Sequence, residues 1–275
     1  MSIIKTKNRL KSTKSTQKVI KAMELVASSK IKKAKENVIN NNNYFFEIIE
    51  IMNYLKTQEE IQKHLEKNKK QELVITITSD MGLCGGYNNN ILKLSINYLK
   101  EKNTINCIVG NKGITKFDYE KINVNYKLGD SKTKSDYDLA KEIANIITDL
   151  LNKKEINNVK VIYMRFVNPL VQEVDILDLF EFSEEIKEIN EYIVDGNKQK
   201  IMDQLVEQYI ISVSYNCVLN ARASEYAARR NSMEAANNNS LELIEKLDGE
   251  INRIRQAMIT QEISEIIGGA EALKE

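Results

Sequence analysis

The sequence has 275 residues, 42% of them hydrophobic, and a formal net charge of +1. This apolar content argues against wholesale disorder, and the balanced total charge does not point to a nucleic-acid binder. One proline and ten glycines disfavour a turn-rich all-β fold and favour long, uninterrupted elements. A single histidine and three separated cysteines argue against a zinc site and a disulfide framework. The sequence also lacks an apolar run of about 18 residues, the length that spans a membrane.

Residues 1–60 are predicted to form one long helix. The segment has no glycine or proline up to Lys56, and its apolar residues recur at helical spacing. They are Ile20, Met23, Ala27, Ile31, Ala34, Val38, Phe45, Ile49, Met52 and Leu55. Between Met1 and Lys35 there are eleven basic residues and one acid, Glu24. We therefore expect this helix to meet an acidic partner, such as a nucleic acid, an anionic lipid surface or an acidic protein loop. A solvated helix face is the alternative.

Residues 71–195 change to a pattern in which strands alternate with helices. Strands are predicted at residues 73–78, 105–109, 124–128 and 159–167, with an edge strand at 171–182, and helices at 88–100 and 136–153. This alternation predicts a parallel or mixed sheet with right-handed crossovers.

Residues 198–275 are predicted to form a second long helix. Its apolar residues again follow helical steps, and they include Leu205, Tyr209, Val213, Cys217, Ile244, Leu247, Ile251, Ile254 and Met258. Both long helices must bury a stripe, and both leave the same central domain, so they are expected to pair antiparallel. The predicted fold class is α plus α/β: an antiparallel coiled coil of very long N- and C-terminal helices with an inserted small, Rossmann-like α/β domain.

A glycine-rich loop follows the first predicted strand. Its glycines are Gly82, Gly85 and Gly86, and a turn of this kind can cradle phosphate with backbone N–H groups. The loop lacks the Lys-Ser/Thr ending of a P-loop and the spacing of the dinucleotide fingerprint. A tight turn that exposes backbone to a partner is therefore the favoured interpretation. Cys84 is either a reactive thiol near a helix N-terminus or simply a small residue, and Asp80 is either a helix cap or an acid.

Two function classes remain open on these features alone. A coiled-coil adaptor or nucleic-acid binder would use the basic first helix, although that stretch lacks the interleaved aromatic residues that stack on bases. An enzyme would bind a nucleotide at the glycine loop. His64 lies among charged residues and is expected to be solvated rather than catalytic.

Three blocks, in this order, resemble the gamma subunits of F-type ATP synthases, which are central rotor shafts. The blocks are residues 4–34, 79–88 and 252–273, and the resemblance extends over the whole chain. It implies a non-catalytic subunit, present once per complex and peripheral on the cytoplasmic face of a bacterial cell membrane. The implied partners are the alpha and beta subunits, the epsilon subunit and the membrane ring of c subunits, and no nucleic acid. No catalytic residue, metal or cofactor is implied for this chain, whereas the complex uses ATP or ADP, phosphate and magnesium.

The resemblance also implies site residues. Contacts with the alpha and beta subunits would be made by Lys18, Lys21, Met23, Lys30, Cys84, Arg229, Arg255, Gln256, Thr260 and Glu262. A bearing stripe in an apolar sleeve would be formed by Ile259, Ile263, Ile266, Ala270 and Leu273. The sequence departs from the family pattern at Met81, Arg230 and Ile251, where arginine, methionine and an aromatic residue are usual. It has no cysteine-containing insert, so redox control by a disulfide is not expected.

Overall fold

The computed structural model describes residues 3–56, 71–100, 103–131, 133–180 and 198–272. The predictions for His64, for residues 181–195 and for Leu273 lie outside the described residues. The chain divides into two compact units, one formed by Met1–Val26 with Arg230–Glu275 and the other by Ala27–Arg229. The second unit contains the inner parts of both long helices, which are the first helix from Ala27 onward and the second helix up to Arg229. These parts belong to the same unit as the central α/β domain because they contribute to its core.

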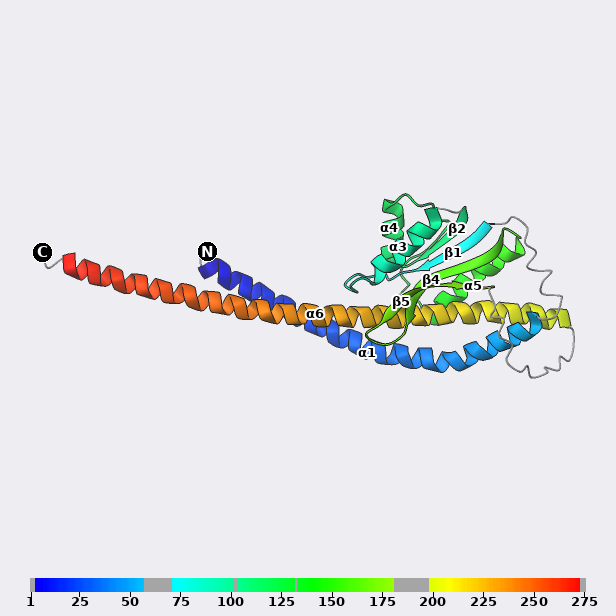
Figure 1. The fold of residues 1–275 in the computed structure, drawn as a ribbon, viewed down its shortest axis with the longest axis horizontal. Helices are drawn as coiled ribbons and strands as arrows, with labels where there is room; N and C mark the ends of the chain where they lie inside the picture. The colour runs from blue at the N-terminus through cyan, green and yellow to red at the C-terminus, as the bar shows by residue number, and fades with distance from the viewer. Residues whose placement is uncertain (1–2, 57–70, 101–102, 132, 181–197, 273–275) are drawn as a thin grey trace. The chain divides into compact units, whose positions relative to one another are not determined.

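The second unit contains one five-stranded sheet with the strand order β3-β2-β1-β4-β5 (Figure 1). The strands are β1 (Gln71–Ile77), β2 (Thr104–Val109), β3 (Tyr126–Leu128), β4 (Ile156–Phe166) and β5 (Gln172–Asp178). Neighbours from β3 to β4 are parallel, and β5 is antiparallel to β4 at the edge. The mixed sheet predicted from the sequence is therefore confirmed, with a shorter third strand.

Helices cover both faces of this sheet. On one face, α3 (Tyr87–Lys100) and α4 (Asn111–Tyr119) enclose a core that includes Val74, Ile91, Ile108 and Phe117. On the other face, α5 (Asp136–Asn152) and the inner parts of the long helices enclose a larger core, which includes Ile75, Ile143 and Val218.

Helix α4 is the element that the sequence reading missed. Gly110 and Gly113 make the segment resemble a loop, but each glycine permits a close approach to the end of β1. A Cβ atom at Gly113 would lie 2.6 Å from Oγ1 of Thr78, and one at Gly110, whose φ is +93°, would lie 2.3 Å from the Thr78 carbonyl oxygen. The backbone N–H of Gly113 donates a hydrogen bond to Thr78 Oγ1. The glycines therefore seat the helix against the sheet rather than interrupt it.

The two long helices are α1 (Ile3–Lys56) and α6 (Lys198–Ala272), and α6 continues through the run of three asparagines at residues 237–239. Within the second unit, Ala34 and Val38 of α1 pack with Leu219 and Ala223 of α6.

Within the first unit, Gln17 Nε2 donates a hydrogen bond of 2.8 Å to Asn237 Oδ1, and Lys14 Nζ lies 3.3 Å from Asp248 Oδ2. In each unit later residues of α1 face earlier residues of α6, which confirms antiparallel pairing. Among the described helices, none is both long and apolar enough to cross a bilayer.

We predict that Phe117→Ala destabilises the protein by about 3–5 kcal/mol, because this fully buried ring fills the space between α4 and the sheet. Tyr119→Ala on the same helix is the matched control, since its side chain is 78% exposed and surface changes usually stay within about 0.5 kcal/mol. Equilibrium urea unfolding followed by circular dichroism measures both. Equal losses in the two variants would contradict the packing assigned to α4.

Candidate functional site

The glycine loop joins β1 to α3 and is closed by its own side chains. The Ser79 N–H donates to Asn88 Oδ1 at 3.0 Å, and the Ser79 hydroxyl donates to the Met81 carbonyl oxygen at 2.7 Å. Leu83 and Gly85 adopt positive φ angles of 62° and 56°, so the backbone turns sharply. Met81 and Leu83 are 50% and 59% exposed. The loop thus presents two apolar side chains to solvent, in addition to the backbone exposure considered from the sequence.

Cys84 points away from solvent. It is 2% exposed, and its sulfur accepts a hydrogen bond of 3.3 Å from Asn88 Nδ2. Burial raises the pKa of the Cys84 thiol above its usual value, which works against a reactive thiolate. A partner that approaches this loop therefore meets Met81, Leu83 and backbone before it meets the Cys84 sulfur.

Asp80 serves as a remote cap for α4. Its Oδ1 accepts a hydrogen bond of 3.1 Å from the N–H of Asn111, the first residue of that helix, and its Oδ2 accepts one of 2.6 Å from the Ser131 hydroxyl. Of the two roles considered from the sequence, the geometry favours the cap. The carboxylate ties the loop after β1 to two neighbouring segments.

A small cavity lies behind the loop, lined by Thr78, Tyr87, Ser131, Arg222 and Glu225 among others. Its volume is about 10 Å³, close to the space that a single water requires. Ligand pockets are typically about 300–1,000 Å³. This cavity therefore does not offer room for a nucleotide.

Arg229, a residue of α6, contacts the glycine loop. It is 8% exposed, and its Nη2 donates to the Met81 carbonyl oxygen at 3.1 Å while lying 2.8 Å from Glu225 Oε1. Arg229 thus contacts the loop that contains Cys84 and the glycines, through the carbonyl oxygens of Met81 and Gly82. The resemblance had named these residues without indicating a contact between them. Arg229 Nη2 is thus engaged by groups of the same chain.

The basic residues singled out on α1 face solvent. Lys18, Lys21 and Lys30 are all exposed, as expected, and Met23 is half-buried. Lys21 forms an ion pair of 2.9 Å with Glu24 on its own helix. Within the second unit, the Lys30 ammonium lies 5.3 Å from the centre of the Tyr226 ring. These side chains are available to an acidic partner at little structural cost.

Near the end of α6, the side chains of residues 255–267 are all exposed. Arg255, Gln256, Thr260 and Glu262 face solvent, and the Thr260 hydroxyl donates to the Gln256 carbonyl oxygen. The exposed apolar residues here are Met258, Ile259, Ile263, Ile266 and Ile267, at 45–71%. The Ala270 side chain and the whole of Leu273 lie outside the described residues. An apolar stripe left exposed on a helix is typical of an interaction surface.

At the three positions that depart from the family pattern, two side chains have roles within the chain. Arg230 forms an ion pair of 3.3 Å with Glu234, and Ile251 is half-buried. Met81 keeps an exposed side chain, so the loop offers an apolar group where a charge is usual.

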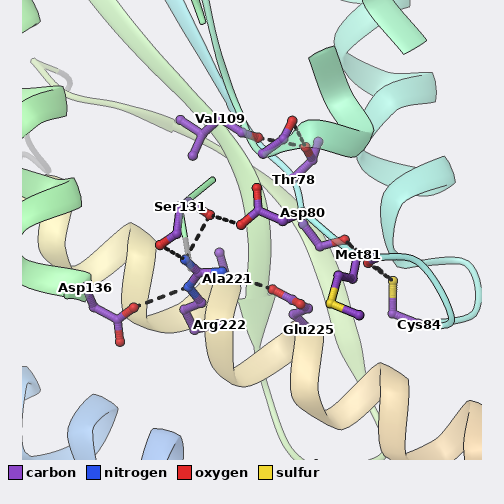
Figure 2. Close-up of polar contacts among 12 residues, drawn as sticks. Thr78, Asp80, Met81, Cys84, Val109, Ser131, Asp136, Ala221, Arg222 and Glu225 are labelled. Carbon is purple, nitrogen blue, oxygen red and sulfur yellow. Dashed lines mark hydrogen bonds and ion pairs between the residues drawn. The ribbon is translucent and has the colours of Figure 1, made fainter. Parts of the chain in front are cut away.

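Sequence reading missed a buried charged group on α6. Arg222 is 7% exposed and Glu225 is 1% exposed, and Figure 2 shows Arg222 between Ser131 and Asp136 on one side and Glu225 on the other. The signal was present: Arg222, Glu225 and Arg229 are spaced by three and four residues in a stretch of small and apolar residues. Charges at one helical face within such a stretch indicate a buried ion-pair network rather than a solvated flank.

Comparison with known proteins gives one family. The ATP synthase family model matches residues 2–273. ATP synthase gamma chains of Clostridium botulinum (strain Kyoto / Type A2) and Clostridium novyi (strain NT) are 35% and 34% identical, each over 98% of both chains.

Solved structures share the fold. The rotor of the Euglena gracilis mitochondrial ATP synthase is similar with a TM-score of 0.65 at 19% identity, over 94% of this chain and 98% of that one. A chain of the Tetrahymena thermophila mitochondrial ATP synthase central stalk and c-ring gives 0.59 at 24% identity, over 79% and 99%. With curated relatives matched from end to end, this chain belongs to the ATP synthase gamma-chain family.

Proposed function

We propose that this chain is the non-catalytic central-stalk rotor of an F-type ATP synthase. One copy would stand in a ring of alpha and beta subunits and rest, with an epsilon subunit, on a membrane ring of c subunits at the cytoplasmic face of a bacterial membrane. The observation that carries the proposal is the end-to-end similarity to gamma chains together with an antiparallel helix pair that ends in an exposed apolar stripe.

The mechanism is a shift of population by a mechanical ligand. Ion flow would turn the c ring, the α/β domain would turn with it, and the asymmetric surface of the helix pair would meet each catalytic subunit in turn. A surface that contacts one conformation of a subunit better than another changes its nucleotide affinity by that difference in contact energy. The chain itself makes and breaks no bond, and we propose that it binds no nucleotide or metal while the complex uses ATP or ADP, phosphate and magnesium.

The charges of α1 support an acidic partner loop. Exposed lysines interact with a partner over about 8–10 Å at physiological salt, so they can guide each approaching subunit without a buried ion pair. On α6, Arg255 and Gln256 offer forked donors that suit carboxylate and carbonyl groups.

Affinity isolation of the tagged chain from solubilised membranes tests this function. We expect one copy of the chain with alpha-, beta-, epsilon- and c-like partners, and magnesium-dependent ATP hydrolysis that the chain alone lacks. Recovery of the chain alone, or with nucleic acid that salt removes, would contradict the proposal and favour a nucleic-acid adaptor. Direct ATP binding by the isolated chain would favour the enzyme alternative.

We predict that replacing Lys18, Lys21 and Lys30 together by alanine lowers ion pumping per ATP hydrolysed and leaves stability almost unchanged. All three side chains are exposed, so the expected change in stability is about 1 kcal/mol or less. Pumping in membrane vesicles and thermal unfolding measure the two effects. Replacing Lys93, Lys141 and Lys153, which are also exposed, removes the same charge from the α/β domain and should change neither. A variant that loses stability but pumps as many ions per ATP as the unchanged chain would refute this role.

We predict that Arg255→Ala with Gln256→Ala weakens the grip of the catalytic ring on the chain by about tenfold, since truncated interface contacts of this kind cost about 1–2 kcal/mol. Alanine preserves helix propensity, so the helix should remain intact. Retention of the chain by a reconstituted alpha–beta ring, and the ATPase rate, measure the change. Glu245→Ala with Lys246→Ala, an exposed pair on the same helix, is the control. Unchanged retention and rate would contradict the assignment.

A further inference from the structure

Residues 209–229 of α6 are buried and yet rich in polar side chains. The polar residues that are at most 8% exposed are Ser212, Ser214, Asn216, Asn220, Arg222, Ser224, Glu225 and Arg229. Apolar residues of similar volume would fill the same space, and replacing a buried ion pair in this way is often neutral or stabilising. Stability alone therefore does not account for the charges in this stretch.

Arg222 is the most extensively bonded of these residues (Figure 2). Its Nη2 donates to the carbonyl oxygen of Ser131 at 2.8 Å and to the Ser131 hydroxyl at 2.9 Å. Its Nε donates to Asp136 Oδ1 at 3.2 Å, and its Nη1 to Glu225 Oε2 at 3.3 Å. The guanidinium group thus spans from α6 to the loop after β3 and to the start of α5.

The contacts continue beyond Arg222. The Ser131 hydroxyl donates to Asp80, which in turn accepts from the N–H of Asn111 at the start of α4. We call Arg222, Glu225, Ser131, Asp136 and Asp80 the Arg222 joint. Through this joint, α6 is connected to segments that follow β1 and β3 and to the first turns of α4 and α5.

Hydrogen bonds on either side of the joint fix the same stretch of α6. The Tyr87 hydroxyl donates to the Ala221 carbonyl oxygen at 3.1 Å, and the Ser224 hydroxyl donates to the Met164 carbonyl oxygen at 3.0 Å. The N–H of Phe166 donates to Asn220 Oδ1 at 3.3 Å. These bonds reach α3 and the end of β4, so the helix is held from several elements of the sheet domain.

The directions of these bonds matter for a part that must transmit force. Apolar packing in a protein interior is close, but apolar attraction is non-directional and roughly proportional to buried area, so it does not by itself define a bond direction. Hydrogen bonds weaken steeply with distance and angle, and a shift of about 1 Å would lengthen those of Arg222 beyond bonding range. A forked guanidinium adds a preferred orientation to this resistance.

We propose that Arg222 is a positioning residue that locks α6 to the sheet domain in rotation and along its axis. Force applied to the α/β domain is then passed to α6 instead of being lost in slippage between the two. This inference rests on the proposed rotor function. It adds a specific joint, held by one buried arginine, at which torque enters the long helix.

Arg222→Met tests the joint with little loss of packing. Glu225 keeps its ion pair with Arg229 at 2.8 Å, and Asp136, whose side chain is 33% exposed, can be solvated. Arg222→Lys keeps the charge but cannot reproduce the fork. Arg165→Met is the matched control, because Arg165 also pairs with a carboxylate, Glu173 at 2.8 Å, but joins only the exposed surfaces of β4 and β5.

The experiment uses the complete complex in membrane vesicles. ATP hydrolysis with an uncoupling ionophore measures the unloaded motor, and ATP synthesis driven by an imposed ion gradient measures it under load. For Arg222→Met we expect normal amounts of complex and normal unloaded hydrolysis, with synthesis lowered about tenfold. A tenfold lower rate of synthesis corresponds to a barrier raised by about 1.4 kcal/mol. Arg222→Lys should fall between Arg222→Met and the unchanged chain, and Arg165→Met should match the unchanged chain.

Two results would overturn the joint. One is full synthesis by Arg222→Met, and the other is a parallel loss of hydrolysis and synthesis in complex that assembles in normal amounts, which indicates a purely structural role. If Arg222→Met does not assemble, Arg222→Lys decides by the same criteria: selective loss of synthesis supports the joint, and full synthesis refutes it. Failure of the unchanged chain to support coupled synthesis would instead overturn the proposed function, and the joint with it.

Discussion

The structure depends on one stretch of α6 in which nearly every side chain is buried. Between residues 209 and 227, one side of the helix contributes Cys217, Val218 and Ala221 to the core beneath the sheet. Another side places Leu219 and Ala223 against α1. A helix that is buried all round belongs to the interior of a domain. Because both partners pack on this stretch, it anchors the inner parts of the long helices and the sheet as one compact unit.

Burial along α6 then declines toward its C-terminus. After Arg230, the helix buries occasional residues, such as Met233, Asn237 and Leu247, as expected of a two-helix pair with one buried seam. From Met258 to Ile267 every described side chain is exposed. One continuous helix therefore passes through three environments, which suit anchoring, pairing and contact with another molecule in turn.

Periodicity in the sequence was sufficient to predict the two long helices, α3, α5 and the strands. The long helices lack proline and carry apolar stripes at helical spacing, so tertiary packing had no conflicting local preference to override. The strands were recognisable as short apolar runs between turn signals. Helix α4 escaped because Gly113, which resembles a helix breaker, is required for close approach to Thr78. The third strand was predicted at residues 124–128, but only Tyr126–Leu128 pair with β2, so β3 is shorter than predicted.

The surface residues were more predictable than the buried polar ones. Exposure of Lys18, Lys21 and Lys30 follows from their place between apolar positions of α1. Arg222 is different, since its partners Ser131 and Asp136 are about ninety residues earlier in the chain. Such a contact depends on how the sheet folds back on α6, which no local pattern contains. The spacing of Arg222, Glu225 and Arg229 could have indicated buried charges, but only the structure identifies Ser131 and Asp136 as their partners.

The contacts around Arg222 and those expected along residues 258–267 differ in how strongly they depend on direction. Around Arg222, contacts are directional, with several hydrogen bonds to one guanidinium. Along residues 258–267, the exposed residues with large side chains include Met258 and four isoleucines, which would contact a surrounding sleeve without directional preference. An unpaired helix gains nothing from exposed isoleucine, whose β-branched side chain slightly lowers helix propensity. For a rotor, non-directional contact permits turning where the chain must turn, and directional contact prevents it where the chain must grip.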